Sequence, residues 1–130
     1  SAKAKLPKTT VMEYRTSGGY RVLCGKNNIQ NEQITFKMSE KSDYWFHVKN
    51  LPGSHTVMLC HGEEPSERDF TEAAEIAAYY SKATAGPVAV DYTKVKNIKK
   101  PAASATAANA ANTNTKRSNT EKYIKFPHFL

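Results

Sequence analysis

Gly25-Lys26-Asn27-Asn28-Ile29-Gln30-Asn31 is a polar turn between an apolar run, 20–24, and a segment, 29–38, whose apolar spacing predicts a short helix. Glycine allows the tight turn, and Asn27 or Asn28 can cap the helix by accepting a hydrogen bond from a free backbone N–H. Lys26 adds a cation beside the positive helix end, a combination that favours a bound phosphate or carboxylate. The alternative is a turn and a cap with no ligand. The turn lacks the glycine spacing of a P-loop, which argues against nucleotide hydrolysis.

Two hairpins flank this turn. Before it, the β-prone runs 11–16 and 20–24 are separated by Ser17-Gly18-Gly19, which is a strong hairpin signal. After it, 44–48 and 55–60 predict two more strands. The segment between them contains Pro52-Gly53, a pair that suits a type II turn.

The main helix is predicted over about 67–83. Ser66 with Asp69 is typical of a helix N-terminal cap, and the apolar residues from Phe70 to Tyr80 recur every three or four positions. Residues 88–92 predict another strand, and an extended 94–100 would present a row of lysines. The expected fold class is α+β, with a mainly antiparallel, mixed sheet, this helix on one face, and the short helix at about 29–38.

The chain divides into four segments by composition. Residues 1–10 are expected to be a flexible lead-in, and 11–101 to be one domain, for which 130 residues give enough core. Residues 102–120 are rich in Ala, Asn, Thr and Ser and are expected to be a flexible low-complexity segment. Residues 121–130 are apolar enough for a closing edge strand, and Pro127 argues against a central position.

The net charge of +7 is unevenly distributed along the chain. Residues 1–60 carry nine basic and four acidic side chains, 61–92 carry two and seven, and 93–130 carry eight and one. If the two basic flanks fold onto one face, they form a surface that attracts phosphate, as nucleic-acid binding requires; otherwise they are a solvated face. No apolar run approaches the length of a membrane span and no signal peptide is evident, so we expect a cytoplasmic protein.

Catalytic and metal-binding motifs are missing from the sequence. Cys24 and Cys60 are expected to be reduced and buried, and His47, His55 and His61 show no zinc-binding spacing with them. We therefore expect no cofactor, no metal and no enzymatic activity. A small nuclease that uses His47 and His55 is kept as an alternative.

Contacts to RNA are the better chemical interpretation. Lysines can contact phosphates, while Tyr80 and the aromatic residues of 44–48 can stack on bases. Alternation along a strand directs either Tyr44, Phe46 and Val48 or Trp45 and His47 inward. We favour Phe46 in the core and Trp45 with His47 near the site.

Several segments together, in order and at the usual spacing, resemble the NFACT-R domain. This is the RNA-binding domain of ribosome-quality-control factors, whose bacterial members are often called fibronectin-binding proteins. The resemblance runs from about residue 20 to Pro101. The segments that carry it are Gly25 to Glu32, Asp43 to Lys49, Leu51 to His55, Ala73 to Lys82 and Val90 to Pro101.

The resemblance implies a cytosolic, non-catalytic module of a longer protein that binds an obstructed large ribosomal subunit and recruits tRNA, so that the stalled chain receives a C-terminal tail. Its partners would be rRNA and tRNA. Residues 102–120 depart from the family pattern, which has a short glycine-containing turn there. Carried over by position, the RNA-facing residues are Lys26, Asn27, Asn28, Gln30, Asn31, Trp45, His47, Lys49, Ser54, His55, Tyr80, Ser81, Lys82, Lys96, Asn97, Lys99 and Lys100.

A protein-interaction module is the remaining alternative, including adhesion to a host matrix protein such as fibronectin. It predicts an exposed apolar patch, whereas RNA binding predicts affinity that depends on salt.

Overall fold

A single antiparallel sheet is the centre of the fold in the computed structural model, which describes residues 11–82, 87–100 and, by their backbone, 121–125. In the order β1-β2-β4-β3-β5-β6, all neighbouring strands are antiparallel. The prediction of an α+β fold is confirmed. The strands are β1 (Met12–Arg15), β2 (Arg21–Cys24), β3 (Tyr44–Val48), β4 (Thr56–Leu59), β5 (Pro87–Lys94) and β6 (Glu121–Lys125).

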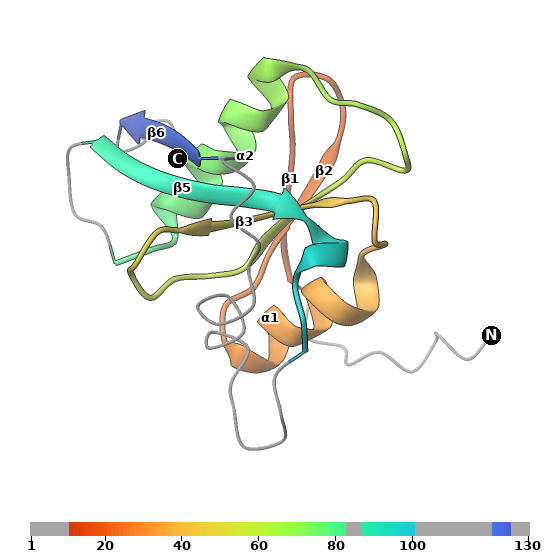
Figure 1. The fold of residues 1–130 in the computed structure, drawn as a ribbon, viewed down its shortest axis with the longest axis horizontal. Coiled ribbons are helices and arrows are strands. Elements are labelled where there is room, and N and C mark those ends of the chain that lie inside the picture. Colours follow the sequence, from red (N-terminus) through yellow and green to blue (C-terminus); the bar gives the residue numbers. More distant parts are fainter. Residues whose placement is uncertain (1–10, 83–86, 101–120, 126–130) are drawn as a thin grey trace.

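Helices cover both faces of this sheet (Figure 1). The main helix, α2 (Glu67–Tyr79), lies on one face, and the short helix α1 (Asn28–Gln33) lies on the other, where the π-helical turn η2 (Ile34–Met38) continues it. The 3₁₀ turn η3 (Val95–Asn97) follows β5, and Val95 packs in the same core as Ile34 of η2. The sheet therefore has no open face in its central strands.

Alternation along the strands sends neighbouring residues into two separate cores. Phe46 packs against α2, with Val22 and Met58 beside it. Trp45 packs into the second core, which contains Ile34. Alternation alone predicts that only one side of β3, either Phe46 and Val48 or Trp45 and His47, enters a core. All four residues are buried, because both faces of the sheet are covered. Phe46 is 0% exposed and Trp45 is 1% exposed.

Three local predictions about the chain path are wrong: the type II turn at Pro52-Gly53, the strand over 94–100 and the end of α2 at residue 83. In the β3–β4 loop, the backbone takes a positive φ at Asn50 and not at Gly53, so Pro52-Gly53 does not form a type II turn. Segment 94–100 does not continue as a strand. Val95 and Ile98, three residues apart, are both buried in the second core; a strand would direct them to opposite faces, whereas a 3₁₀ turn keeps them together.

Helix α2 also stops earlier than the predicted 83, with Tyr80 as its C-cap. Ser81 donates from Oγ to the carbonyl of Ala78 at 2.7 Å, and its backbone forms a bridge with Gly53. These bonds satisfy the end of the helix and direct the chain toward the β3–β4 loop. Residue 83, the segments predicted at 1–10 and 102–120, and residues 126–130 of the closing strand predicted at 121–130 lie outside the described residues.

Asp69 joins the β1–β2 hairpin to the start of α2. Its carboxylate accepts hydrogen bonds from the backbone N–H of Gly18 at 2.8 Å and of Ser66 at 2.9 Å, and Ser66 completes the predicted capping box. A Cβ on Gly18 would lie 2.7 Å from the carboxylate, so a larger residue at this position would displace Asp69 from its hydrogen bonds. Burial acts to raise the pKa of Asp69, but hydrogen bonds from Thr16, Ser66 and Gly18 outweigh it and lower the pKa to about 2.

The substitution Asp69→Asn tests this junction. We expect it to lower the free energy of unfolding by about 1–3 kcal/mol at pH 7, because Asn cannot replace the charged acceptor of several hydrogen bonds. The stabilisation should be complete above pH ~4, which is near the ordinary pKa of an aspartate carboxyl. It should be lost as pH falls toward the lowered pKa of about 2. Urea unfolding between pH 7 and pH 2.5 measures both effects.

The exposed Glu40→Gln is the control, since no partner of its side chain is described and it should leave the unfolding curve nearly unchanged. Equal pH dependence in the wild type and in Asp69→Asn would contradict the assignment.

Candidate nucleic-acid interface

Side-chain amides hold the turn between β2 and α1. Asn27 caps α1 by accepting from the backbone N–H of Gln30 at 2.9 Å, which settles the choice between the two predicted caps. Gln30 in return accepts from the backbone N–H of Lys26 at 2.9 Å. Lys26, Asn27 and Asn28 remain exposed on this fixed backbone. The turn thus presents one cation and two amides to solvent in a defined arrangement.

Asn31 ties the turn to the start of β4. Its side chain is buried, and Oδ1 accepts from the backbone N–H of His55 at 3.1 Å. The backbone N–H of Gly25 donates to the carbonyl of His55 at 3.1 Å, so the two segments are joined twice. A Cβ on Gly25 would collide with Oδ1 of Asn31, which explains the glycine at this position.

The β3–β4 loop is joined in turn to the end of α2. Ser54 donates from its backbone to the carbonyl of Tyr80 at 3.4 Å, and Lys82 donates to the carbonyl of Pro52 at 3.2 Å. Since β2 ends and β4 begins at the same end of the sheet, the turn, the loop and the helix end are brought together there. Three of the predicted groups, 26–31, 49–55 and 80–82, therefore share one end of the molecule.

The aromatic and imidazole side chains of the predicted site lie beneath this surface. The rings of Trp45 and His47 stack with centroids 5.6 Å apart, and His55 meets both edge-on. His47 is 6% exposed and His55 0%, and Nδ1 of His55 bonds to Oγ1 of Thr35 at 2.8 Å. Gln30 and Asn31 are buried as well. Direct RNA contact by these five residues stays a prediction, and none of them is on the accessible surface.

A π-helical turn supports this buried cluster from the second face. It runs from Ile34 to Met38, and Ser39 closes it by donating from Oγ to the carbonyl of Thr35 at 2.8 Å. Such wide turns are rare and occur often at functional sites. Apolar spacing predicts a helix here and gives no signal that its second half widens.

The lysines after β5 occupy a different position. Lys94 pairs with Tyr44, so segment 95–100 starts at the end of the sheet opposite to the β3–β4 loop. From there, Val95 and Ile98 pack beside Ile34, which places the segment on the α1 and η2 side of the molecule. Figure 1 shows it running past α1. The exposed lysines of this segment are Lys96, Lys99 and Lys100, while Asn97 is half-buried and donates to Oγ1 of Thr93 at 2.7 Å.

Sequence reasoning missed two exposed lysines on this side. Lys37 lies in the last turn of η2, and the carbonyl of Lys41 accepts from the backbone N–H of Lys96 at 3.1 Å. Both lie within segments whose sequence indicates only a helix and a polar loop.

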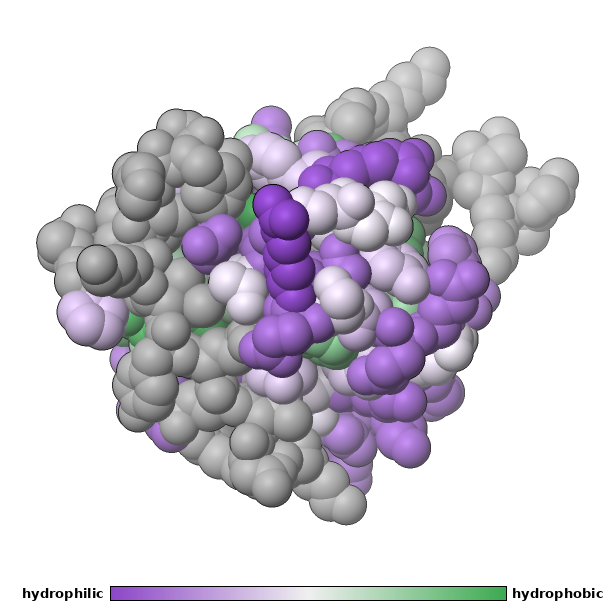
Figure 2. Space-filling model, turned by 90° about the horizontal axis from the view of Figure 1, so that it is seen from above, coloured by the Kyte–Doolittle hydropathy of each residue, from purple (hydrophilic) through white to green (hydrophobic). Residues whose placement is uncertain are grey.

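Acidic residues, in contrast, gather at α2, which carries Glu67, Asp69, Glu72 and Glu75. Figure 2 shows the end of the molecule with the hairpin tip and the start of α2, where most coloured residues are hydrophilic and hydrophobic ones are confined to small areas.

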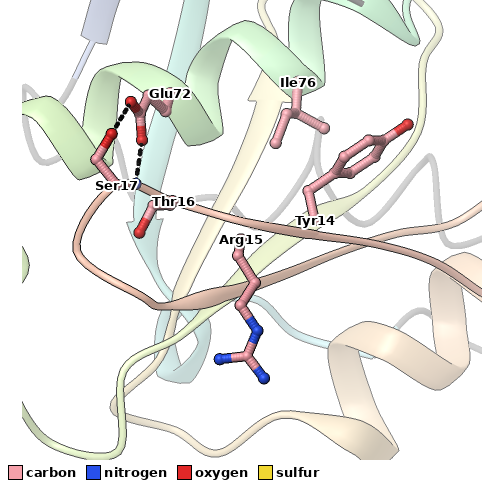
Figure 3. A pocket seen from close by; sticks show the side chains of 6 residues that line it. All are labelled: Tyr14, Arg15, Thr16, Ser17, Glu72 and Ile76. Carbon is pink, nitrogen blue, oxygen red and sulfur yellow. Dashed lines mark hydrogen bonds between the residues drawn. The ribbon is translucent and has the colours of Figure 1, made fainter.

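A pocket of about 270 Å³ lies away from the predicted site, between β1 and α2. Figure 3 shows Tyr14 and Ile76 facing this space, Arg15 pointing away from it, and Ser17 bound to Glu72 at 2.6 and 2.7 Å. None of the predicted RNA-facing residues lines it. In the described residues, no group of three His, Cys, Asp or Glu side chains could hold a metal ion, and neither α1 nor α2 has the length and hydropathy of a membrane-spanning helix.

Burial lowers the pKa of His47, although the hydrogen bond to the carbonyl of Val48, the backbone of Gly53 and the charge of Asp91 act in the opposite direction. The folded protein therefore holds this ring neutral, whereas the unfolded chain takes up a proton below about pH 6.5. We expect the free energy of unfolding to fall as pH drops from 7.5 to 5.5. The fall should be smaller in His47→Gln, measured by urea unfolding at both pH values.

His61→Gln is the matched control because His61 is exposed, and it should keep the pH dependence of the wild type. If His47→Gln loses as much stability on acidification as the wild type does, His47 is not the titrating group.

Known proteins are similar to this chain in sequence and in fold. The family profile of the NFACT protein RNA binding domain matches residues 10–111. The Rqc2 homolog RqcH of Bacillus subtilis is 46% identical over 101 residues, and that of Streptococcus suis 47% over 87 residues; the matches cover 76% and 66% of this chain. They cover 17% and 16% of those relatives, so this chain spans less than a fifth of their length.

A solved structure resembles this chain as well. It is the C-terminal part of the fibronectin/fibrinogen-binding protein from Streptococcus suis, with a TM-score of 0.74 and 36% sequence identity. The match covers 92% of this chain and 46% of that one. Since the family profile covers most of the chain and the fold agrees, this chain belongs to the family of NFACT protein RNA-binding domains.

Proposed function

We propose that this domain binds rRNA or tRNA on obstructed large ribosomal subunits, as one module of a ribosome-quality-control factor. The observation that carries the proposal is membership of an RNA-binding family whose similar relatives are named Rqc2 homologs. In the full-length protein the domain would support addition of a C-terminal tail to the stalled chain, in the cytoplasm. It would bind and position RNA and carry out no reaction of its own.

The arrangement of charges supports this role. The exposed Lys26 stands on a turn fixed by side-chain amides, and the exposed Lys96, Lys99 and Lys100 lie on the α1 and η2 side. Phosphate contacts need cations held in place, and amides beside them can bond to 2′-hydroxyls. The acidic residues of α2 lie on the other face, where they repel RNA and favour one orientation of binding.

The buried members of the predicted site have a supporting role in this proposal. Asn31 and His55 hold the turn and the β3–β4 loop together, and Trp45 with His47 fills the space beneath them. We propose that they fix the contact surface and that the exposed lysines and amides bind the RNA. Burial also argues against a nuclease that uses His47 and His55, because a substrate cannot reach either ring.

Protein adhesion is a second candidate, favoured by the name of the structurally similar Streptococcus suis protein. It would require a contact surface for a matrix protein, and the binding would not follow RNA-type salt dependence.

Removal of two lysines tests the RNA proposal. We expect Lys99→Ala/Lys100→Ala to weaken binding of tRNA and rRNA fragments, because a lysine that neutralises a phosphate releases a counterion from the RNA and alanine cannot. The slope of log affinity against log salt should become shallower by about 0.7–0.9 for each phosphate that the variant no longer neutralises. Fluorescence anisotropy with labelled RNA over 50–300 mM salt measures both quantities.

The charge-matched control is Arg15→Ala/Arg68→Ala, which removes two exposed cations that lie away from Lys99 and Lys100. This variant should keep the wild-type slope of log affinity against log salt. Undetectable RNA binding at low salt would reject the proposal, and equally weakened binding in the two double variants would reject the assigned surface. Binding of a matrix protein that persists in both would favour adhesion. Co-sedimentation of the full-length protein with large ribosomal subunits tests the wider role.

A further inference from the structure

Three large hydrophobic residues stay exposed in the described part of the chain, and all three lie at the end of the molecule where the turn before α1, the β3–β4 loop and the end of α2 come together. Ile29 in the first turn of α1 is 70% exposed, Leu51 in the β3–β4 loop 40%, and Tyr79 at the end of α2 37%. The hydrogen bonds that join the loop to residues 80–82 bring Leu51 and Tyr79 to the same end. The turn that precedes Ile29 is bonded to His55 of that loop.

Tyr79 is held in a fixed environment. Its ring meets the ring of Tyr80 edge-on, with centroids 4.9 Å apart and an angle of 81°. Tyr80 is fixed in turn by the hydrogen bond between its hydroxyl and that of Tyr14, and it packs against the core under α2. A ring held by a fixed neighbour loses little conformational freedom when a ligand stacks on it.

Three lysines belong to the same segments as these apolar residues. Lys26 precedes α1, Lys49 begins the β3–β4 loop, and Lys82 follows Tyr79 by three residues. An apolar ring beside lysines suits unpaired nucleotides, which offer a base face and a phosphate together. A duplex offers only phosphates, sugars and groove edges, because its bases are stacked on one another.

We propose that this end of the domain binds unpaired RNA nucleotides, with a base stacked on Tyr79, Leu51 beside it and Ile29 at the same end, and the flanking phosphates on Lys26 and Lys82. The inference rests on the proposed RNA-binding function and narrows its ligand to single-stranded or loop RNA. The lysines of segment 95–100, on the α1 and η2 side, contact the backbone of the same RNA without reading its bases.

Competition between two RNA probes tests this inference. The probes are a labelled 12-nucleotide single strand and a hairpin whose stem contains the same sequence in paired form, compared at equal salt. We expect the single strand to bind at least several-fold more tightly. Tyr79→Ala should weaken its binding by about 5- to 150-fold, the range for removal of one stacked base, with little effect on the hairpin.

Tyr79→Phe keeps the ring and is the matched variant, which should retain the affinity of the wild type. Leu51→Ala should weaken single-strand binding by a smaller factor. Urea unfolding of each variant separates loss of binding from loss of folding, and because Tyr79 is partly exposed, its replacement should preserve the fold.

The outcomes distinguish the inference from the function on which it rests. Equal affinity for both probes, with Tyr79→Ala changing neither, overturns the inference and leaves RNA binding intact. Binding of neither probe rejects the RNA-binding function itself. If Tyr79→Ala keeps full affinity for the single strand yet no longer co-sediments with large ribosomal subunits, this end contacts ribosomal protein and the inference is wrong.

Discussion

Burial of the sheet on both faces is the constraint on which the rest of this structure depends. Neighbouring residues of one strand, such as Trp45 and Phe46, enter two different cores, so the central strands have little room for polar side chains. Exposed groups that can bind a ligand must therefore come from turns, loop tips and helix ends. This is why the candidate surface is built from the turn before α1, the β3–β4 loop and the end of α2.

Buried hydrogen bonds hold these three segments in place, and their partners are amides and backbone groups. Asn31 is the clearest example, because its side-chain oxygen is bonded to the backbone of His55 while Gly25 leaves room for it. A buried polar group without a partner costs free energy, so each such bond also penalises alternative loop positions. Asp69 acts in the same way at the opposite end of the sheet, between the hairpin tip and α2.

Local sequence patterns were sufficient to predict the parts of the fold that local chemistry determines. The β1–β2 hairpin follows from Ser17-Gly18-Gly19, and the start of α2 follows from Ser66 with Asp69. Tertiary packing decided the rest. Val95 and Ile98 form a 3₁₀ turn because the second core takes up both, and a lysine-rich run gives no sign of that core. Ile34 of the π-helical turn Ile34–Met38 packs in the second core with residues of β4, and apolar spacing gives no sign of the π-helical form.

The same distinction applies to the candidate site. Family resemblance selected a set of positions, but it did not separate the exposed side chains from the buried ones. Trp45 and His47 carry the residue types expected of a base-stacking platform, and some RNA-binding domains do stack bases on the open face of a sheet. That arrangement is impossible here, because η2 and η3 cover the face on which Trp45 lies. In the interaction proposed here the exposed ring is Tyr79 at the end of α2, with Lys82 three residues further along the chain.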